Sequence, residues 1–523
     1  MWGILRDPCD ENVIRSAPER ATCTKSRGRW ILAATILASS MAFIDGTVVN
    51  VALPALQTNL NATAVDVQWV IEAYALLLSA FLLVGGSLGD HYGRRLIFLI
   101  GVALFAIASA ACGFAANVDQ LIAARAFQGF GAALLIPGSL AIISSSFSEQ
   151  ERGRAIGTWS GFSAITSGIG PVLGGWLIEH VSWRAVFFIN LPIALLVILI
   201  SLRHVAENSD REKSRIDWVG AILAVCGLGA LVYGLIESPQ LGFGNRAVMT
   251  VLIVAGVLLI VFAFVESRRS DPMLPLTLFR SRIFTGTNLL TFLLYAALGG
   301  TLFFLPLNLI QVQHYSPTAA GAALLPFILI VSVLSRWSGG LVSRYGARLP
   351  LIVGPLIVAL GYALFLLPGV GGGYWLNFFP PIIALGLGMA ITVAPLTTTV
   401  MNSVSQSHAG IASGVNNAVA RTAGLIAIAV LGIVMLHVFE NALDKRLVEL
   451  RVPELAAQSL RSQTTKLAAI VIPDELDRAT QQIIRRSIGE SFVSGFRAVM
   501  SVGVGLSLAG MATAVALIRG SDS

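Results

Sequence analysis

Long uninterrupted apolar runs, separated by short polar segments, dominate the chain. A helix needs about 20 apolar residues to cross a bilayer, and these runs are about that long. Strands of membrane β-barrels are about 10 residues of alternating polarity, which does not fit runs of this kind. We therefore predict an all-α integral membrane protein with about fourteen spans. They are expected near Trp30–Ala52, Val67–Gly89, Leu96–Ala116, Leu121–Ser144, Ala155–Ile178, Ala185–Leu202, Trp218–Ile236, Val248–Val265, Phe284–Leu307, Ala319–Val342, Leu349–Leu367, Trp375–Met401, Ala409–Val438 and Phe492–Ile518.

Composition supports the same class of protein. Of the 523 residues, 55% are hydrophobic and only 12% are charged. A soluble protein is about 25% charged, so this chain lacks the polar groups to cover a water-exposed surface. Its solvent is expected to be the lipid bilayer.

Basic residues in the loops predict the orientation. Alternate loops are rich in arginine, as at Arg94, Arg95, Arg152 and Arg154, whereas the loops between them hold few basic residues. The rule that positive loops stay inside places both termini in the cytoplasm and the chain in the cytoplasmic membrane. The net charge of +7 then reflects topology, and no basic patch interleaved with aromatic residues indicates a nucleic-acid partner. Because residues 1–29 contain no apolar core, we expect no cleavable signal peptide.

An internal repeat divides the chain. Gly86, Tyr92, Gly93, Arg95 and Gly101 recur 253 positions later (339 − 86 = 253) as Gly339, Tyr345, Gly346, Arg348 and Gly354. The two copies lie eight spans apart rather than six, so two extra spans should separate two six-helix halves, an arrangement found in transporters. We expect a cytoplasmic tail at 1–29, an N-terminal half at 30–203, two inserted helices at 217–266 and a C-terminal half at 284–518. Residues 439–490 should form an extracytoplasmic segment. Apolar residues at helical spacing in 440–451 and 474–488 predict surface-lying helices there, with a structural cap favoured over a receptor role.

Four motifs carry a resemblance to a known family. They are Phe43–Pro54 (FIDGTVVNVALP), the loop Gly86–Arg95 (GSLGDHYGRR), Arg125–Ala132 (RAFQGFGA) and Gly168–Gly175 (GIGPVLGG). With these four motifs in this order, the chain resembles the major facilitator superfamily and, more narrowly, its fourteen-span drug:proton antiporters. The resemblance implies a major facilitator fold with two six-helix halves and two inserted spans. It also implies a monomer that uses the proton gradient, needs no cofactor, and exports amphipathic or cationic drugs by alternating access.

Three ionisable residues fall at a similar depth in the predicted N-terminal half. Asp45 lies about 22 Å above the inner end of the first span, at 1.5 Å per residue, and Glu72 and Arg125 lie near that level. A charge at membrane depth costs about 2.5–3.5 kcal/mol, so these residues are expected to pair. We hypothesise that Asp45 and Glu72 couple transport to protons or bind cations and that Arg125 tunes them. The alternative is a static ion-pair cluster, and the resemblance assigns coupling roles to the Asp45 and Arg125 positions.

Two glycine-rich motifs suggest mechanical roles. Gly86 and Gly93 permit a tight reversal, and Asp90 at a helix C-terminus needs compensation, which Arg94 could supply. This loop is expected to form an inner gate, or else to be a plain topogenic loop. In the fifth span, Gly170 and Gly174 form a seam of small residues, and Pro171 bends the helix. The resemblance links that pattern to antiport, although packing alone would also explain it.

Polar residues in other spans are candidates for the substrate cavity. Arg421 lies near the midplane, where an ionised residue indicates a functional site. It could bind an anionic group of the substrate, pair with a carboxylate, or bond to neighbouring carbonyls. The residues assigned to the cavity are Tyr74, Gln128, Asn288, Asn417 and Arg421.

Other classes of protein find little support. The sequence shows no P-loop, no Ser-His-Asp set and no spacing typical of metal ligands, so neither an enzyme nor an ATP-driven pump is expected. Four scattered cysteines give no disulfide framework. The alternatives that stay open are a dedicated metabolite or lipid exporter, an uncoupled facilitator of the same fold, and a membrane-embedded receptor.

Overall fold

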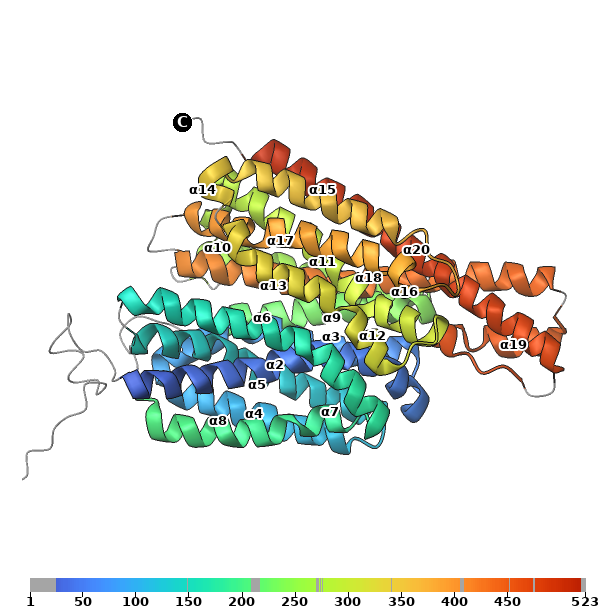
Figure 1. Ribbon diagram of the computed structural model, residues 1–523, viewed down its shortest axis with the longest axis horizontal. Helices are drawn as coiled ribbons and strands as arrows, with labels where there is room; N and C mark the ends of the chain where they lie inside the picture. The colour runs from blue at the N-terminus through green and yellow to red at the C-terminus, as the bar shows by residue number, and fades with distance from the viewer. Residues whose placement is uncertain are drawn as a thin grey trace, which may run out of the picture.

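The computed structural model describes residues 25–147, 149–207, 217–269, 272, 274, 276–339, 341–404, 409–450, 452–473 and 476–518. Every regular element in these ranges is helical (Figure 1). Residues 1–24 of the predicted tail lie outside the described residues.

The all-α prediction is confirmed, and each of the fourteen predicted spans coincides with a helix or a broken pair of helices. Twelve helices in the described ranges are long and apolar enough to cross a membrane. The two predicted spans that are not among these twelve correspond to α6 and α15. The α15 helix has only 17 residues. The span count from the sequence is therefore approximate.

The first part of the chain forms one bundle, drawn in blue to green in Figure 1. Its helices are α2 (Lys25–Leu60), α3 (Ala64–Tyr92), α4 (Arg94–Phe114), α5 (Val118–Ser146), α6 (Glu149–His180), α7 (Ala185–Phe188) and α8 (Asn190–His204). The last part forms a second bundle beside it. Its elements are η1 (Leu276–Arg280), α11 (Arg282–Leu307), η2 (Asn308–Val312), α12 (Pro317–Ala323), α13 (Leu325–Gly339), α14 (Leu341–Tyr345), α15 (Arg348–Leu364), α16 (Tyr374–Asn377), α17 (Phe379–Asn402), α18 (Ala409–Glu449), α19 (Glu454–Arg461), η4 (Thr464–Ala469) and α20 (Arg478–Leu517).

Matched glycines make matched contacts in the two bundles. A Cβ atom on Gly101 of α4 would lie 3.0 Å from the carbonyl oxygen of Gly131 in α5. Gly354, the repeat partner of Gly101, meets Gly388 of α17 in the same way, with 2.9 Å to its carbonyl oxygen. Small residues let helix backbones approach this closely. The repeat read from the sequence thus has a counterpart in packing.

Helices α9 (Trp218–Leu241) and α10 (Arg246–Arg268) join the two bundles in the chain. The α9 helix packs against both α3 and α18 through an apolar cluster that includes Leu76, Val232 and Leu425. The Trp69 indole nitrogen donates to Glu237 at 3.2 Å and ties α3 to the far end of α9. Only 11% of the most apolar stretch of α10 is buried, so this helix faces lipid along most of its length.

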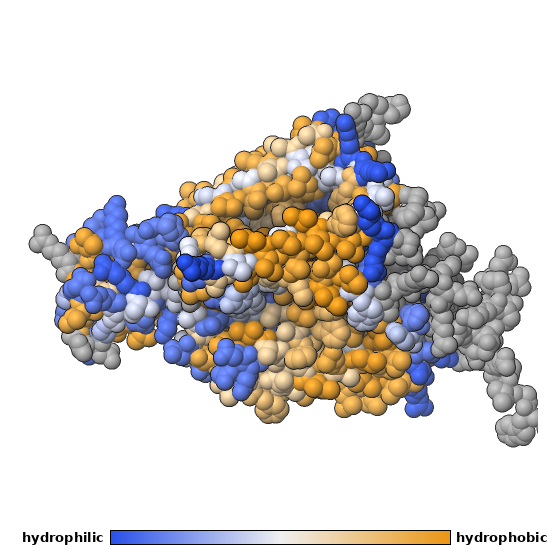
Figure 2. Space-filling model, turned by 180° about the vertical axis from the view of Figure 1, so that it is seen from behind, coloured by the Kyte–Doolittle hydropathy of each residue, from blue (hydrophilic) through white to orange (hydrophobic). Residues whose placement is uncertain are grey.

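On the face that Figure 2 shows, hydrophobic residues form a broad belt, with polar residues at both ends. At one end α18 and α20 run on past the belt and, with α19 and η4, form a projection that we call the cap (Figure 1). The expectation of separate surface-lying helices at 440–451 and 474–488 differs from this arrangement. Their apolar faces pack on each other, burying Leu443, Leu447, Ile484 and Ile488, rather than lying on a membrane surface.

The contacts between the two bundles gather at the end that carries the cap. The Gln311 amide of η2 donates to the Gln57 side chain of α2 at 2.6 Å, and Thr318 donates to Glu179 at 2.6 Å. Lys466 of the cap donates to Asn61 in the α2–α3 turn at 2.9 Å. The bundles are therefore joined at the cap end.

Candidate functional site

A buried ion pair lies at the centre of the N-terminal bundle. Asp45 of α2 is 0% exposed and Arg125 of α5 is 1% exposed, and the guanidinium donates to the Asp45 carboxylate. Arg125 Nε also donates to the carbonyl oxygen of Val70 in α3 at 3.0 Å. Two charges removed from water are stable only when paired and hydrogen-bonded, and this pair meets both conditions.

An amide network completes the surroundings of Asp45. Gln128 accepts from Arg125 at 2.7 Å and donates to Asp45 at 2.8 Å. It also donates to the Ser109 hydroxyl at 3.2 Å, and Asn190 donates to that hydroxyl at 2.9 Å. Gln128 was predicted to line the substrate cavity, but here it is fully buried inside one bundle. Sequence reasoning missed Ser109 and Asn190, because their motifs carry no distinctive spacing.

Tyr74 of α3 packs against this network. Its ring lies 4.2 Å from the Arg125 guanidinium carbon, a cation–π distance, and its hydroxyl points to the Ala42 carbonyl oxygen at 3.4 Å. Arg421 belongs to α18 of the second bundle. Among the described residues Arg421 has no hydrogen bond or ion pair. The sequence assigns Arg421 and Tyr74 to one cavity, and that assignment stays a prediction.

Glu72 does not join Asp45 and Arg125. On a helix with 3.6 residues per turn, Glu72 shares a face with Gln68, Trp69 and Leu76 rather than with Val70 and Tyr74. That face packs against α9 and α18. Glu72 is 0% exposed, and neither of its carboxylate oxygens has a hydrogen-bond partner among the described residues. The three residues predicted to pair thus separate into a bonded pair and a lone acid.

Asparagine side chains connect α11 and α18 in the second bundle. Asn416 donates to Asn288 at 3.1 Å and to Thr291 at 2.7 Å, and Asn288 donates to the Phe284 carbonyl oxygen at 2.9 Å. Asn288 is therefore bound within the helix pair, whereas Asn417 next along the chain is exposed. Of these two cavity candidates, only Asn417 presents an accessible side chain.

The predicted gate loop is a tight turn between α3 and α4. Gly93 adopts φ +115°, which strongly favours glycine, and its amide donates to Gly89. The Glu207 carboxylate accepts from the amides of Arg95 at 3.0 Å and Leu96 at 3.1 Å, capping α4.

The other predicted gate residues lie on either side of this turn. Gly86 faces Pro137 of α5, and a Cβ atom on Gly86 would lie 3.7 Å from the Pro137 side chain. Arg94 begins α4, and the Asp90 side chain lies outside the described residues. Nothing in the loop's spacing indicated Glu207.

The glycine motif of α6 is a two-sided seam. Cβ atoms on Gly170 and Gly174 would overlap Thr47 and Val48 of α2. On its other side the motif meets the second bundle. A Cβ atom on Gly175 would overlap the carbonyl oxygen of Pro317, and a Cβ atom on Gly321 of α12 would overlap the carbonyl oxygen of Pro171. The motif therefore packs α6 tightly against its own bundle and against the other bundle.

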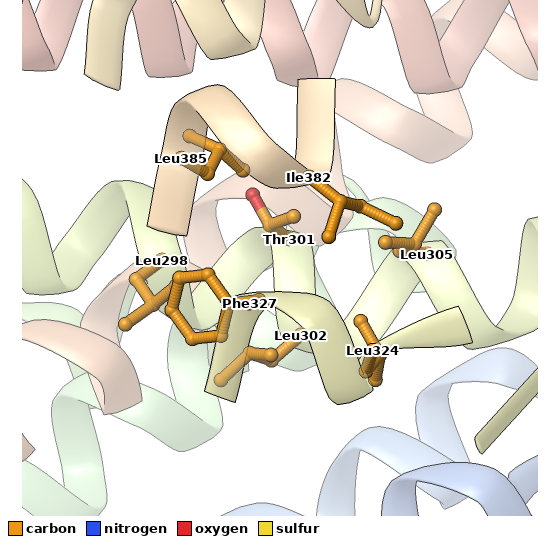
Figure 3. A pocket seen from close by; sticks show the side chains of 8 residues that line it. All are labelled: Leu298, Thr301, Leu302, Leu305, Leu324, Phe327, Ile382 and Leu385. Carbon is orange, nitrogen blue, oxygen red and sulfur yellow. The ribbon is translucent and has the colours of Figure 1, made fainter. Parts of the chain in front are cut away.

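One small cavity lies inside the second bundle, between α11, α13 and α17 (Figure 3). Its volume is about 10 Å³, and Thr301 is the single polar residue among those that line it. The Thr301 hydroxyl is already bonded to Ala297 and Tyr362. This is a packing void too small for a substrate.

Metal binding finds no support in the described ranges, where no group of three or more His, Cys, Asp or Glu side chains converges. Ionised groups paired across helices at membrane depth are instead typical of substrate and ion pathways.

Comparison with known proteins agrees with this architecture. The chain is 35% identical over 452 residues to the multidrug resistance protein Stp of Mycobacterium tuberculosis, covering 86% of this chain and 82% of that protein. It is 32% identical over 499 residues to the tetracenomycin C resistance and export protein of Streptomyces glaucescens, covering 94% and 92%.

A solved structure shares the fold. A bacterial homologue of the human lysosomal transporter Spinster superposes with a TM-score of 0.65 at 18% identity, covering 96% of this chain and all of that one. The sequence profile described as Major Facilitator Superfamily matches residues 35–428. A multi-pass membrane transporter with drug-efflux relatives, this chain belongs to the Major Facilitator Superfamily.

Proposed function

We propose that the chain is an antiporter that exports amphipathic, mainly cationic small molecules in exchange for protons, by alternating access. It acts as a monomer in the cytoplasmic membrane, with both termini in the cytoplasm and the cap outside. The relatives named for multidrug resistance and for tetracenomycin C export favour outward movement of organic compounds.

Glu72 is the observation that carries the proposal. An ionised carboxylate without a partner is costly in a dry interior, so this side chain is expected to hold a proton in the conformation described. It lies on the α3 face that packs against α18 of the opposite bundle and against α9. If the two bundles move apart there, water or a cationic substrate can reach the carboxyl group and the proton can leave. Proton release and substrate binding would then compete at one residue.

Asp45 and Arg125 have a supporting role in this scheme. Their pair holds α2, α3 and α5 together, and Tyr74 stacks on Arg125. A movement of Arg421 with the second bundle would reach Arg125 through Tyr74, and Asp45 would take up a proton only when Arg125 leaves it. Tyr74, Arg421 and Asn417 would line the substrate path, with Asn288 and Gln128 behind it.

Opening and closing would occur at the two ends of the bundles. At the cap end, the Gly170–Gly175 seam closes the path outside. At the opposite end, the loop with Gly86, Asp90, Gly93 and Arg94 would form the inner gate.

Reconstituted vesicles loaded with a pH-sensitive dye test the proposal. Ethidium added to wild-type vesicles should move protons across the membrane, and Glu72→Gln should abolish that movement. Asp45→Asn should reduce it. Asp119→Asn, which changes an exposed acid of α5, serves as the matched control and should behave as wild type.

The outcomes separate the alternatives. Equal substrate movement with and without a pH gradient, unchanged by Glu72→Gln, would identify an uncoupled facilitator. If ethidium and other lipophilic cations fail to move protons but one metabolite or lipid does, the chain is a dedicated exporter.

A further inference from the structure

A second, much larger cavity lies beneath the cap, outside the proposed transport path. Its volume is about 620 Å³, within the range of about 300–1,000 Å³ usual for small-molecule sites. Its walls come from four places: the end of α2, the η2 turn after α11, Val370 between α15 and α16, and the cap with the start of α20. Any molecule bound there would contact both bundles at once.

The lining of this cavity is basic on one side. Arg485 and Arg486 of α20 and His314 after η2 lie along it, and none of the described residues that line it is acidic. Arg486 is paired with Glu490 at 2.9 Å, one turn along the helix. Arg485 has no ion pair or hydrogen bond within the described ranges. An unpaired guanidinium facing a cavity without carboxylates favours an anionic group.

The floor of the cavity is apolar. Val312, Ile470 and Ile488 line it and are buried among themselves and their neighbours. The site therefore offers an apolar surface and a free cation within one cavity.

The backbone at His314 is held in an unusual conformation. Its φ is +57°, a left-handed value that non-glycine residues seldom adopt. Such residues persist where surrounding structure fixes them, and they cluster at binding sites. Here the conformation keeps the imidazole on the cavity wall beside the α20 arginines.

We propose that this cavity binds an amphipathic anion. A phosphate or carboxylate headgroup would lie against Arg485 and His314, and an alkyl chain would lie on Val312, Ile470 and Ile488. Since Thr58 of α2 also lines the cavity, the bound molecule would hold the bundles together at the cap end. The same chemistry could come from an anionic phospholipid of the outer leaflet or from a free fatty acid.

Direct binding to the purified full-length chain tests this assignment. Dodecyl phosphate is titrated into protein in a neutral detergent, and dodecyltrimethylammonium of equal chain length is titrated in parallel. We expect saturable binding of the phosphate only. Arg485→Gln should weaken it by about tenfold or more, the loss expected for one charge-assisted contact.

Two further variants keep the test decisive. Arg478→Gln changes an exposed arginine of the same helix that does not line the cavity, and it should bind as wild type. His314→Gly keeps the left-handed backbone, which glycine adopts freely, and removes only the imidazole, so it should weaken binding without unfolding the turn. Equal binding of the cationic amphiphile, or equal affinity in Arg485→Gln, His314→Gly and Arg478→Gln, would overturn the proposal.

Mass spectrometry of the intact protein distinguishes the two sources. Phosphatidylglycerol or oleate is added, and the one that forms a one-to-one adduct in wild type but not in Arg485→Gln is the natural type of ligand. Absence of both adducts, together with absent dodecyl phosphate binding, would show that the cavity holds only water.

Discussion

Asp45 and Glu72 are both fully buried carboxylates of the N-terminal bundle, but their surroundings differ in kind. Asp45 accepts hydrogen bonds from Arg125 and Gln128, inside one bundle. Glu72 accepts none from the described residues and lies where α3 meets α9 and α18. Both occur at a similar depth, so depth alone does not determine what an acid does.

The difference indicates that Asp45 and Glu72 have separate roles. A carboxylate whose charge is balanced by a cation inside one bundle stabilises that bundle. For a carboxyl group in an apolar contact between bundles, the protonation state depends on whether the contact is open. Glu72 is the one whose proton should follow the conformational cycle. The predictions below test this contrast.

The largest effect is expected on stability. Arg125→Gln would leave Asp45 buried without a cation, and loss of one partner of a buried pair costs about 3–5 kcal/mol. Unfolding of the purified protein in detergent measures this loss. Adding Asp45→Asn to Arg125→Gln should restore more than half of it, because the lone buried charge is then removed.

Glu72→Gln provides the other side of that comparison. It replaces an unbonded group with an amide of the same shape, so the free energy of unfolding should change by less than about 1 kcal/mol. If Glu72→Gln destabilises as much as Arg125→Gln does, Glu72 has a strong partner and the contrast is wrong.

A smaller effect is expected from the contact between the bundles. Gly175→Ala would place a methyl group on the Pro317 carbonyl and disfavour closure at the cap end by about 1–3 kcal/mol. In a variant with all four cysteines replaced by serine, Glu72→Cys should then react at least about fivefold faster with a water-soluble maleimide. Gly256→Ala, on an open face of α10, is the control and should leave the rate unchanged. Equal rates in both backgrounds would mean that Glu72 is not exposed by opening at the cap end.

The smallest effect concerns a carboxylate outside the membrane. Hydrogen bonds from the Thr480 hydroxyl and amide lower the pKa of Asp477, which caps α20. Because the pKa of Asp477 is lower in the folded state, its carboxylate adds to the free energy of unfolding at neutral pH. That contribution disappears as the pH falls through the folded pKa. The unfolding temperature of Asp477→Ala should therefore lie slightly below wild type at about pH 7, and the difference should shrink as the pH falls below about 4. A difference that grows on acidification would contradict this assignment.

The apolar pattern was sufficient to predict the helices and the repeat, because bilayer thickness constrains span length so strongly. The repeat found at Gly101 and Gly354 even corresponds to equivalent helix contacts. The cap was harder to predict. Helical spacing at 440–451 identified an apolar face, but it could not tell whether lipid or another helix covers that face.

The site was predicted in part. An acid in span one and an arginine in span four at one depth favoured a pair, and Asp45 and Arg125 form one. Depth does not determine which way a side chain points around its helix, so Glu72 was grouped with them incorrectly as a pairing partner. Ser109, Asn190 and Glu207 bind through single hydrogen bonds that any similar polar residue could make, and no local pattern marks them.

The α18 helix runs unbroken for 41 residues, about 60 Å at 1.5 Å per residue, from inside the lipid belt to the tip of the cap. It acts as a lever. A tilt of about 10° around its midpoint would carry the tip about 5 Å sideways, since half of its length is about 30 Å. A fluorophore or antibody fragment fixed to the tip would thus report motion of the C-terminal bundle without touching the lipid belt.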